Sequence, residues 1–526
     1  MSSIDYSRAA VARLSRAMKS APAHYSPCRG RLTGRRAMRG AEAVGADVAS
    51  AVLRRYASLG KNGKPQPGEY TLLAGFAVTD GDGPPRVVAI GTGTKCLPAE
   101  SRCPRGEALA DSHAEVIARR ALLRFAYDEL DRLVATDRPE RSDPPPIFER
   151  DPRADASDAN ATQPRAPFRL RPGIRLHLYC SQSPCGDASI FPGSPRVPDA
   201  AVPDAARPEA PPASKRAKTT GAGGGGAGVT GAKLLRSDRA DADAEFGVES
   251  QTVGAARLKP GRGPPTSCMS CSDKMARWAR LGAQGGLLSA VLATPLRIET
   301  VVVAAPGDGD GVPIPGDGEA PYLSALRRAL VTRVESTSER LAAPFGGADA
   351  TTPSVVAASP PPPELSGVAG QRRGWVACGT SINWSADREG TVEVTLGATG
   401  RKAGFAKRDR DSPKATSRVC RASLASRFVR LRRAFSSDRS ADGRTTFDAI
   451  DIDEPRPYAA VKRAAGSSGY DDARDALLRS PSPLSAWSRK DPARFAAFPV
   501  PAPDGDQRRV SGVPSPKKNE PDIEDR

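Results

Sequence analysis

A histidine two residues before a glutamate, at the start of a helical pattern, constrains this 526-residue sequence more than any other feature. The stretch DSHAE at 111–115 contains one of only three histidines in the chain. Apolar residues recur at helical spacing from Val116 onward, so we expect His113 and Glu115 in the first turn of a helix with one buried face. A capping box between Ser112 and Glu115 would explain the same spacing without any chemistry.

Two cysteines lie where extended segments change into helices. Cys185, in SPCGD, follows the strand-like segment 175–180, and Cys271, in MSCSDK, begins a helical run that ends at Gly282. We expect a helix start to favour the thiolate of Cys185. One histidine and two cysteines are a ligand set typical of zinc with an open coordination position. His-x-Glu is also the first half of the signature of zinc-dependent nucleobase deaminases.

Four blocks, in this order, resemble the eukaryotic adenosine deaminases that act on RNA. The blocks are DSHAE at 111–115, SPCGD at 183–187, MSCSDK at 269–274 and SINW at 381–384. The likeness covers about 47–498 and is greatest to the tRNA-specific branch, through GKP at 63–65, YTLLA at 70–74, GTGTKC at 91–96 and RLKPGRG at 257–263. That branch converts to inosine the adenosine just 3′ of the anticodon in alanine tRNA.

The resemblance implies roles for the residues of these blocks. His113, Cys185 and Cys271 would bind zinc, and Glu115 would transfer protons during hydrolytic deamination. Further members of the site would be Asp111 and Lys259, in a polar relay. Cys268 forms a CxxC with Cys271 and would, as a fourth ligand, close the zinc into a structural site. The family has a small or apolar residue there, so we expect Cys268 to be a neighbour of the metal.

The order of elements predicts an α/β fold, and the resemblance specifies a cytidine-deaminase-like three-layer α/β/α core with additional C-terminal helices and disordered inserts. With 50 Gly, 50 Pro and 5% aromatic residues, much of the chain is not expected to form core. The predicted organisation is a basic leader at 1–44, a deaminase domain at 45–498 with low-complexity inserts near 137–167, 193–249, 305–318 and 342–370, and a disordered tail at 499–526. The predicted helices are 45–56, 322–334 and 419–435; the predicted strands are 71–78, 86–90, 296–303 and a late pair within 375–396.

A net charge of +18 indicates a polyanionic partner, for which the resemblance implies tRNA. Thr94 and Lys95, in a glycine-rich turn, are candidate RNA contacts; an ordinary turn is the alternative. The sequence has no apolar run long enough for a membrane, and its irregular cysteines favour a reducing compartment. We expect a nuclear or cytoplasmic protein, with 215–218 as a possible nuclear signal. The Arg-rich, acid-poor leader indicates an organelle as the alternative.

The resemblance also implies a buried inositol hexakisphosphate. Its expected ligands are Arg119, Arg120, Lys274, Arg277, Trp278, Arg421, Tyr458, Lys462, Tyr470, Arg474, Trp487 and Lys490. The alternative is that these are solvated charges on helix faces. Arg421 replaces a lysine of the family, and the spacing from Lys462 to Tyr470 is looser than usual.

Three functions remain open at this point. The first is deamination of adenosine in tRNA, and the second is deamination of another RNA or position. The third is RNA binding by a protein that zinc only stabilises. The presence of Glu115 argues against this last function, because a structural zinc site has no use for that carboxylate.

Overall fold

The computed structural model describes residues 33–135, 144–154, 166–191, 233–234, 252–259, 266–307, 319–341, 345, 352–438, 456–466, 469–487 and 498–500. The chain divides into two units, Met1–Gly40 and Ala41–Arg526. Helix α2 (Thr33–Ser58) contains the predicted helix 45–56 and starts within the predicted leader. Most of that leader and of the tail, 1–32 and 501–526, lies outside the described residues.

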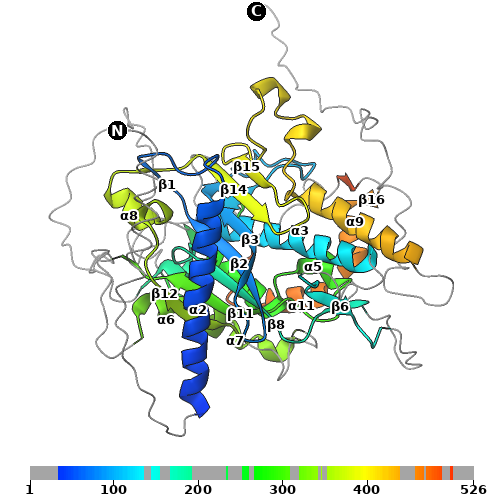
Figure 1. Cartoon of the computed structure of the whole chain (residues 1–526), viewed down its shortest axis with the longest axis horizontal. Coiled ribbons are helices and arrows are strands. Elements are labelled where there is room, and N and C mark those ends of the chain that lie inside the picture. The colour runs from blue at the N-terminus through cyan, green and yellow to red at the C-terminus, as the bar shows by residue number, and fades with distance from the viewer. Residues whose placement is uncertain are drawn as a thin grey trace, which may run out of the picture. The chain divides into compact units, whose positions relative to one another are not determined.

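A seven-stranded mixed sheet is at the centre of the second unit (Figure 1). Its order is β12-β11-β8-β2-β3-β14-β15. Strands β8, β11 and β12 run parallel, whereas β2 is antiparallel to β8 and β3, and β14 is antiparallel to β3 and β15. The strands are β2 (Leu73–Asp80), β3 (Arg86–Thr92), β8 (Ile174–Cys180), β11 (Ile298–Ala304), β12 (Ser354–Ala358), β14 (Thr380–Ser385) and β15 (Val392–Leu396).

Helices cover both faces of this sheet. Strand β2 is therefore buried at every position except Asp80, as expected for a strand with apolar contacts on both sides. On one face, Val48 and Val52 of α2 pack with Leu73 and Ile90. The other face contacts α3 (Ala114–Ala135), α4 (Cys271–Leu281) and α6 (Pro321–Arg327). The predicted three-layer α/β/α core is confirmed.

Additional helices near the C-terminus extend the second of these layers. Helix α9 (Arg421–Asp438) packs on α3, α10 (Tyr458–Gly466) on α5 (Gly285–Ser289), and α11 (Tyr470–Leu477) on α4 and α5. The predicted helix 322–334 is α6 continued by a π-helical segment, η5 (Arg328–Thr332), and α7 (Arg333–Glu335). In the part of the chain that the structure describes, none of these helices has the length and apolar character needed to cross a bilayer.

Short elements complete the described structure. The strands are β1 (Glu69–Tyr70), β4 (Thr94–Cys96), β5 (Asp111–His113), β6 (Phe148–Arg150), β7 (Phe168–Leu170), β9 (Lys233–Leu234), β10 (Arg257–Leu258), β13 (Val376–Ala377), β16 (Arg456–Pro457) and β17 (Pro499–Val500). The helices are η2 (Asp187–Ser189), η6 (Ser338–Arg340), η7 (Pro363–Leu365), α8 (Gly367–Arg372), η8 (Lys407–Asp409) and η9 (Pro413–Ala415).

Three of the predicted inserts contain ordered elements, of which the smallest is β9 (Lys233–Leu234) in 193–249, paired with β10. The range 342–370 includes β12, an edge strand of the central sheet, and most of α8, so the prediction of an insert is wrong for 352–370. The short apolar run of β12 is followed by four prolines at 360–363, a composition typical of a low-complexity insert. In 137–167, Phe148 of β6 is buried in the main core. Most of 193–249 and of 305–318 lies outside the described residues.

Gly91 of β3 allows α3 to approach the sheet closely. A Cβ at this position would lie 2.5 Å from the carbonyl oxygen of Ala114 and closer still to the amide nitrogen of Ala118. Because both atoms belong to the backbone of α3, Gly91→Ala should displace the whole helix. We expect the free energy of unfolding to fall by about 1–3 kcal/mol, measured by urea denaturation. Gly379→Ala, where a Cβ meets nothing within 4 Å, should have no such effect; equal midpoints for the two variants would contradict this packing.

Candidate active site

The histidine of DSHAE ends a strand instead of opening a helix. His113 is the last residue of β5, and α3 begins at Ala114, so the prediction that His113 lies in the first helical turn is wrong by one residue. The reason is β4, which pairs with β5 and places Thr94 opposite His113. Glu115 does lie in the first turn of α3 and is 3% exposed. The thiol of Cys271 donates to Glu115 Oε2 at 3.1 Å, so this carboxylate faces the cysteines.

Both cysteines lie beside the end of β5. Cys271 is the first residue of α4, as predicted, after the N-cap Ser270. Cys185 precedes only the short helix η2, so its support comes from another helix: the amide of Cys271 donates to Cys185 Sγ at 3.4 Å. A hydrogen bond from the side chain of Cys271, followed by the charges of Lys259 and His113, holds the pKa of the Cys185 thiol well below its usual range.

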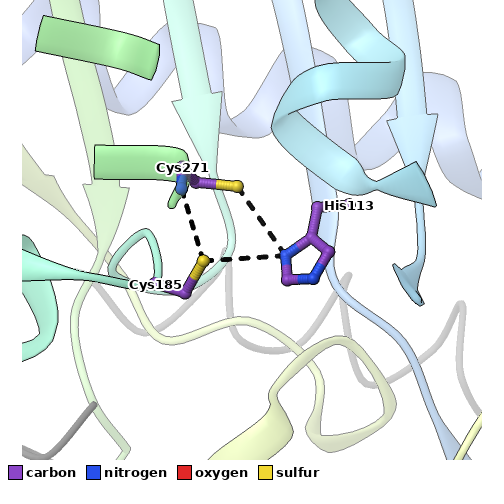
Figure 2. Close-up of side chains that lie close together, drawn as sticks. All are labelled: His113, Cys185 and Cys271. Atoms are coloured by element: carbon purple, nitrogen blue, oxygen red, sulfur yellow. Dashed lines mark hydrogen bonds between the residues drawn. The ribbon is translucent and has the colours of Figure 1, made fainter. Parts of the chain in front are cut away.

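The three side chains converge on one point, with the imidazole facing both sulfur atoms (Figure 2). His113 Nδ1 lies 3.8 Å from Cys185 Sγ and 3.7 Å from Cys271 Sγ. A tetrahedral zinc ion with Zn–N of about 2.0–2.1 Å and Zn–S of about 2.3 Å requires an N···S separation of about 3.6 Å. The donor atoms and their spacing therefore fit a zinc ion held by His113, Cys185 and Cys271.

The predicted polar relay is present and buried. Lys259 Nζ donates to both carboxylate oxygens of Asp111 at 2.8 Å and to Cys271 Sγ at 3.2 Å. Burial opposes the charge on Lys259, but Asp111, Cys271 and Cys185 raise its pKa well above the usual value. The carboxylate of Asp111 also accepts a hydrogen bond from Lys274 and another from the amide of His113. Asp111 thus joins the metal site to two lysines.

Comparison with known proteins assigns this arrangement to a family. Residues 89–491 match the adenosine-deaminase (editase) domain. The chain belongs to the adenosine deaminase (editase) family. It is 30% identical over 522 residues to tRNA-specific adenosine deaminase 1 of Mus musculus, which covers 82% of this chain and 95% of that protein. It is 35% identical over 251 residues to tRNA-specific adenosine deaminase 1 of Drosophila melanogaster, 48% of this chain and 52% of that protein.

The double-stranded RNA editases are also relatives. The Drosophila melanogaster double-stranded RNA-specific editase Adar is 28% identical over 336 residues, 63% of this chain and 40% of that protein. Membership of the editase family shows that the protein is a hydrolase that deaminates adenosine. The α/β sheet with its helices is the cytidine-deaminase-like fold expected for such a domain.

Two arginines of one helical segment support both cysteine motifs of the editase site. Arg328 contacts Asp187 of SPCGD at 3.2 Å, and Arg333 contacts Asp273 of MSCSDK at 2.8 Å. Both carboxylates are fully buried, so these partners are needed to compensate their charge. Sequence analysis missed both arginines, because they lie more than fifty residues from either motif and follow no local pattern.

Cys268 is not part of the ligand group that the structure forms. Its sulfur lies with Cys96 and the Asp111 carboxylate in a second group, and it accepts a hydrogen bond from Arg102 Nη2 at 2.7 Å. Among the described residues, Cys268 thus lies outside the group of His113, Cys185 and Cys271, and its place as a neighbour of a bound metal stays a prediction. Sequence analysis missed Cys96 and Arg102, although Cys96 ends the quoted block GTGTKC.

Most of the residues expected to bind inositol phosphate gather beside α3 and α4. Arg119 lies over the ring of Trp278 at 5.3 Å, and Arg277 over that of Trp487 at 4.6 Å. Two of the expected ligands form ion pairs with carboxylates of the protein. Lys274 pairs with Asp111, and Arg474 pairs with Asp471 and Asp475. Arg421 lies over the ring of Tyr458. Gly286 is flanked by Lys462 and Tyr470, and Arg120 donates a hydrogen bond to the carbonyl oxygen of Val419. Lys490 lies outside the described residues.

These cations repel one another. Burial, followed by Arg277 and Arg120, lowers the pKa of Arg119 to about 10. Burial, followed by Arg474, lowers the pKa of Lys462 to about 8. In the same region, Arg277 Nε and Trp278 Nε1 are buried and have no hydrogen-bond acceptor among the described residues. The group therefore has positive charge and donors that an anion would satisfy.

The ligand assignment predicts different results for neighbouring cysteines. Cys271→Ala should lower bound zinc from about one ion per chain to near zero, because two protein ligands hold the metal far more weakly than three. Cys268→Ala should retain the ion, since its sulfur belongs to the other group. Elemental analysis of the purified variants measures both. Loss of the metal in Cys268→Ala alone would reverse the assignment.

Proposed function

We propose that this protein catalyses the zinc-dependent hydrolytic deamination of adenosine to inosine in tRNA. The observation that carries the proposal is the Glu115 carboxylate, 3.1 Å from Cys271 Sγ, beside a histidine and two thiols with zinc spacing. The names of the mouse and fly relatives support tRNA as the substrate. The net charge of +18 suits an RNA partner, because Lys and Arg displace counterions from phosphates.

The proposed target is the adenosine immediately 3′ of the anticodon of alanine tRNA. The support is the resemblance to the tRNA-specific branch at 63–65, 91–96 and 257–263. The last two of these blocks adjoin the site: Thr94 pairs with His113 across β4 and β5, and Lys259 contacts Asp111. Thr94 and Lys95 remain the proposed contacts with the RNA around the reactive base.

Each residue of the site has a role in this reaction. His113, Cys185 and Cys271 would hold a zinc ion, which would supply a nucleophile for hydrolysis at neutral pH. Glu115 accepts a proton at its carboxylate, donates it to N1 of the adenine as C6 is attacked, and later passes a proton to the departing ammonia. The ammonium of Lys259 stabilises the Cys271 thiolate, and Asp111 keeps that lysine charged.

A second part of the proposal is a bound inositol hexakisphosphate. Its support is the group of half-buried cations around Trp278, four of which have pKa values lowered by burial, Arg119, Arg120, Arg277 and Lys462. The donors Arg277 Nε and Trp278 Nε1, which have no acceptor among the described residues, are further support. A polyanion would raise those pKa values and accept those hydrogen bonds. Because uncompensated buried charges cost several kcal/mol each, we propose that this anion is required for folding.

Replacing the proposed proton shuttle should separate metal binding from catalysis. We expect Glu115→Gln to retain zinc and to form inosine in alanine tRNA at least about 10²–10⁴-fold more slowly, the usual contribution of a general acid–base group. Sequencing of the treated tRNA measures inosine position by position. The exposed Glu299→Gln is the control and should act like the unmodified protein. Near-normal rates in Glu115→Gln would refute the mechanism.

The inositol phosphate proposal predicts dependence on the host cell. Protein produced in cells that cannot synthesise inositol hexakisphosphate should be insoluble or inactive, and protein from ordinary cells should carry the ligand in native mass spectrometry. Lys462→Ala should weaken retention of the ligand, whereas Arg463→Ala, an exposed neighbour, should not. Soluble, fully active protein without the ligand would exclude this part of the proposal.

A further inference from the structure

A second sulfur group lies beside the proposed zinc site and takes no part in the mechanism above. It consists of Cys96, the last residue of β4, and Cys268, three residues before Cys271. The two sulfur atoms and a carboxylate oxygen of Asp111 all lie within 4.8 Å of one another. Cys96 is partly exposed and Cys268 is buried.

Three cations already balance the negative groups here, which argues against a second metal ion. Lys259 and Lys274 both bond the carboxylate of Asp111. Arg102, which is 4% exposed, donates to Cys268 Sγ at 2.7 Å. A divalent ion would have to displace these ammonium and guanidinium groups and would then lie beside them in a buried site. The surroundings instead suit a thiolate at Cys268 that has no metal partner.

The two thiols differ in the way that a nucleophilic and a resolving cysteine differ. The hydrogen bond between them, with burial, raises the pKa of Cys96 well above its usual value. The same hydrogen bond, with the charges of Lys274 and Arg102, lowers the pKa of Cys268 well below its usual value. A low-pKa cysteine beside a second thiol is the arrangement found in redox-sensitive cysteine pairs.

We propose that Cys96 and Cys268 are an oxidation site that forms a reversible disulfide with a peroxide. The Cys268 thiolate attacks one oxygen of hydrogen peroxide, which breaks the O–O bond, gives a sulfenic acid and releases hydroxide. The thiol of Cys96 then attacks the sulfenic sulfur; its sulfur–sulfur bond replaces the S–O bond, and its proton leaves with the oxygen as water. The hydroxide takes up the proton that Cys268 lost in forming its thiolate, so two thiols and one peroxide give one disulfide and two waters.

The position of the pair determines what such a bond would do. Strand β4 pairs with β5, which ends at His113, while Cys268 precedes the segment that enters α4 at Cys271. A disulfide would therefore join the supports of two of the proposed zinc ligands. The bond would also close a loop of more than 170 residues, so it should raise Tm. We expect oxidised protein to release zinc to a chelator more slowly than reduced protein.

The test treats zinc-loaded, full-length protein with increasing hydrogen peroxide, followed by alkylation and peptide mass spectrometry. The expected product is a Cys96–Cys268 cross-link that a dithiol reductant reverses, with one zinc retained per chain. Both Cys96→Ser and Cys268→Ser should abolish the cross-link and the slower release of zinc. Cys103→Ser is the matched control, because Cys103 also lies beside an arginine, Arg401, at 3.7 Å; it should leave the cross-link intact.

Three outcomes would overturn the proposal. One is the absence of a Cys96–Cys268 cross-link at peroxide concentrations that oxidise Cys103. Another is a cross-link of Cys268 to Cys271 with loss of the metal, which would make Cys271 the redox partner. The third is a second zinc ion per chain that disappears in Cys268→Ser, which would show a metal site instead of a thiol pair.

Discussion

The buried carboxylate of Asp111 is the interaction on which the rest of the site depends. It contacts Lys259 just after β10, Lys274 on α4 and the amide of His113 at the end of β5. Burial alone would favour the neutral acid, yet the two lysines hold the pKa of Asp111 well below its usual value. The three segments that supply these partners also carry or adjoin the proposed zinc ligands. Loss of this one charge would remove the carboxylate partner of two buried ammonium groups.

The helices α3 and α4 repeat one arrangement. Each has a residue of the catalytic site at its start, Glu115 or Cys271, and cations within the next two turns, Arg119 and Arg120 on α3 or Lys274 and Arg277 on α4. Arg119 of α3 lies over Trp278 of α4, and its charge is opposed by that of Arg277, whereas Lys274 bonds Asp111. This geometry explains how a deaminase core comes to contain a concentrated positive charge, and why a polyanionic ligand is a reasonable proposal.

Much of the site was predictable because its reactive residues lie in short sequence motifs. The proposed ligands and the glutamate lie in four blocks in a fixed order, and the resemblance that these blocks carry implied the relay of Asp111 with Lys259, which lies in a further block at 257–263. The strands β2, β3 and β11 follow from apolar runs. Predictions failed where a distant segment decides the local structure. His113 belongs to a strand because β4 pairs with it, and β12 is ordered because β11 supplies a neighbour for a run too short to be recognised alone.

The sequence by itself determined which groups are available: one histidine, two thiols and a glutamate in motifs typical of zinc deaminases, with a large excess of positive charge. Tertiary structure decided which groups meet. Arg328 and Arg333 contact the aspartates of the two cysteine motifs, and Arg102 and Cys96 lie beside Cys268. These partners are far apart in the sequence and follow no periodic pattern. The physical reason is that local spacing determines the face of an element on which a side chain lies, whereas its partner depends on how the sheet and helices pack together.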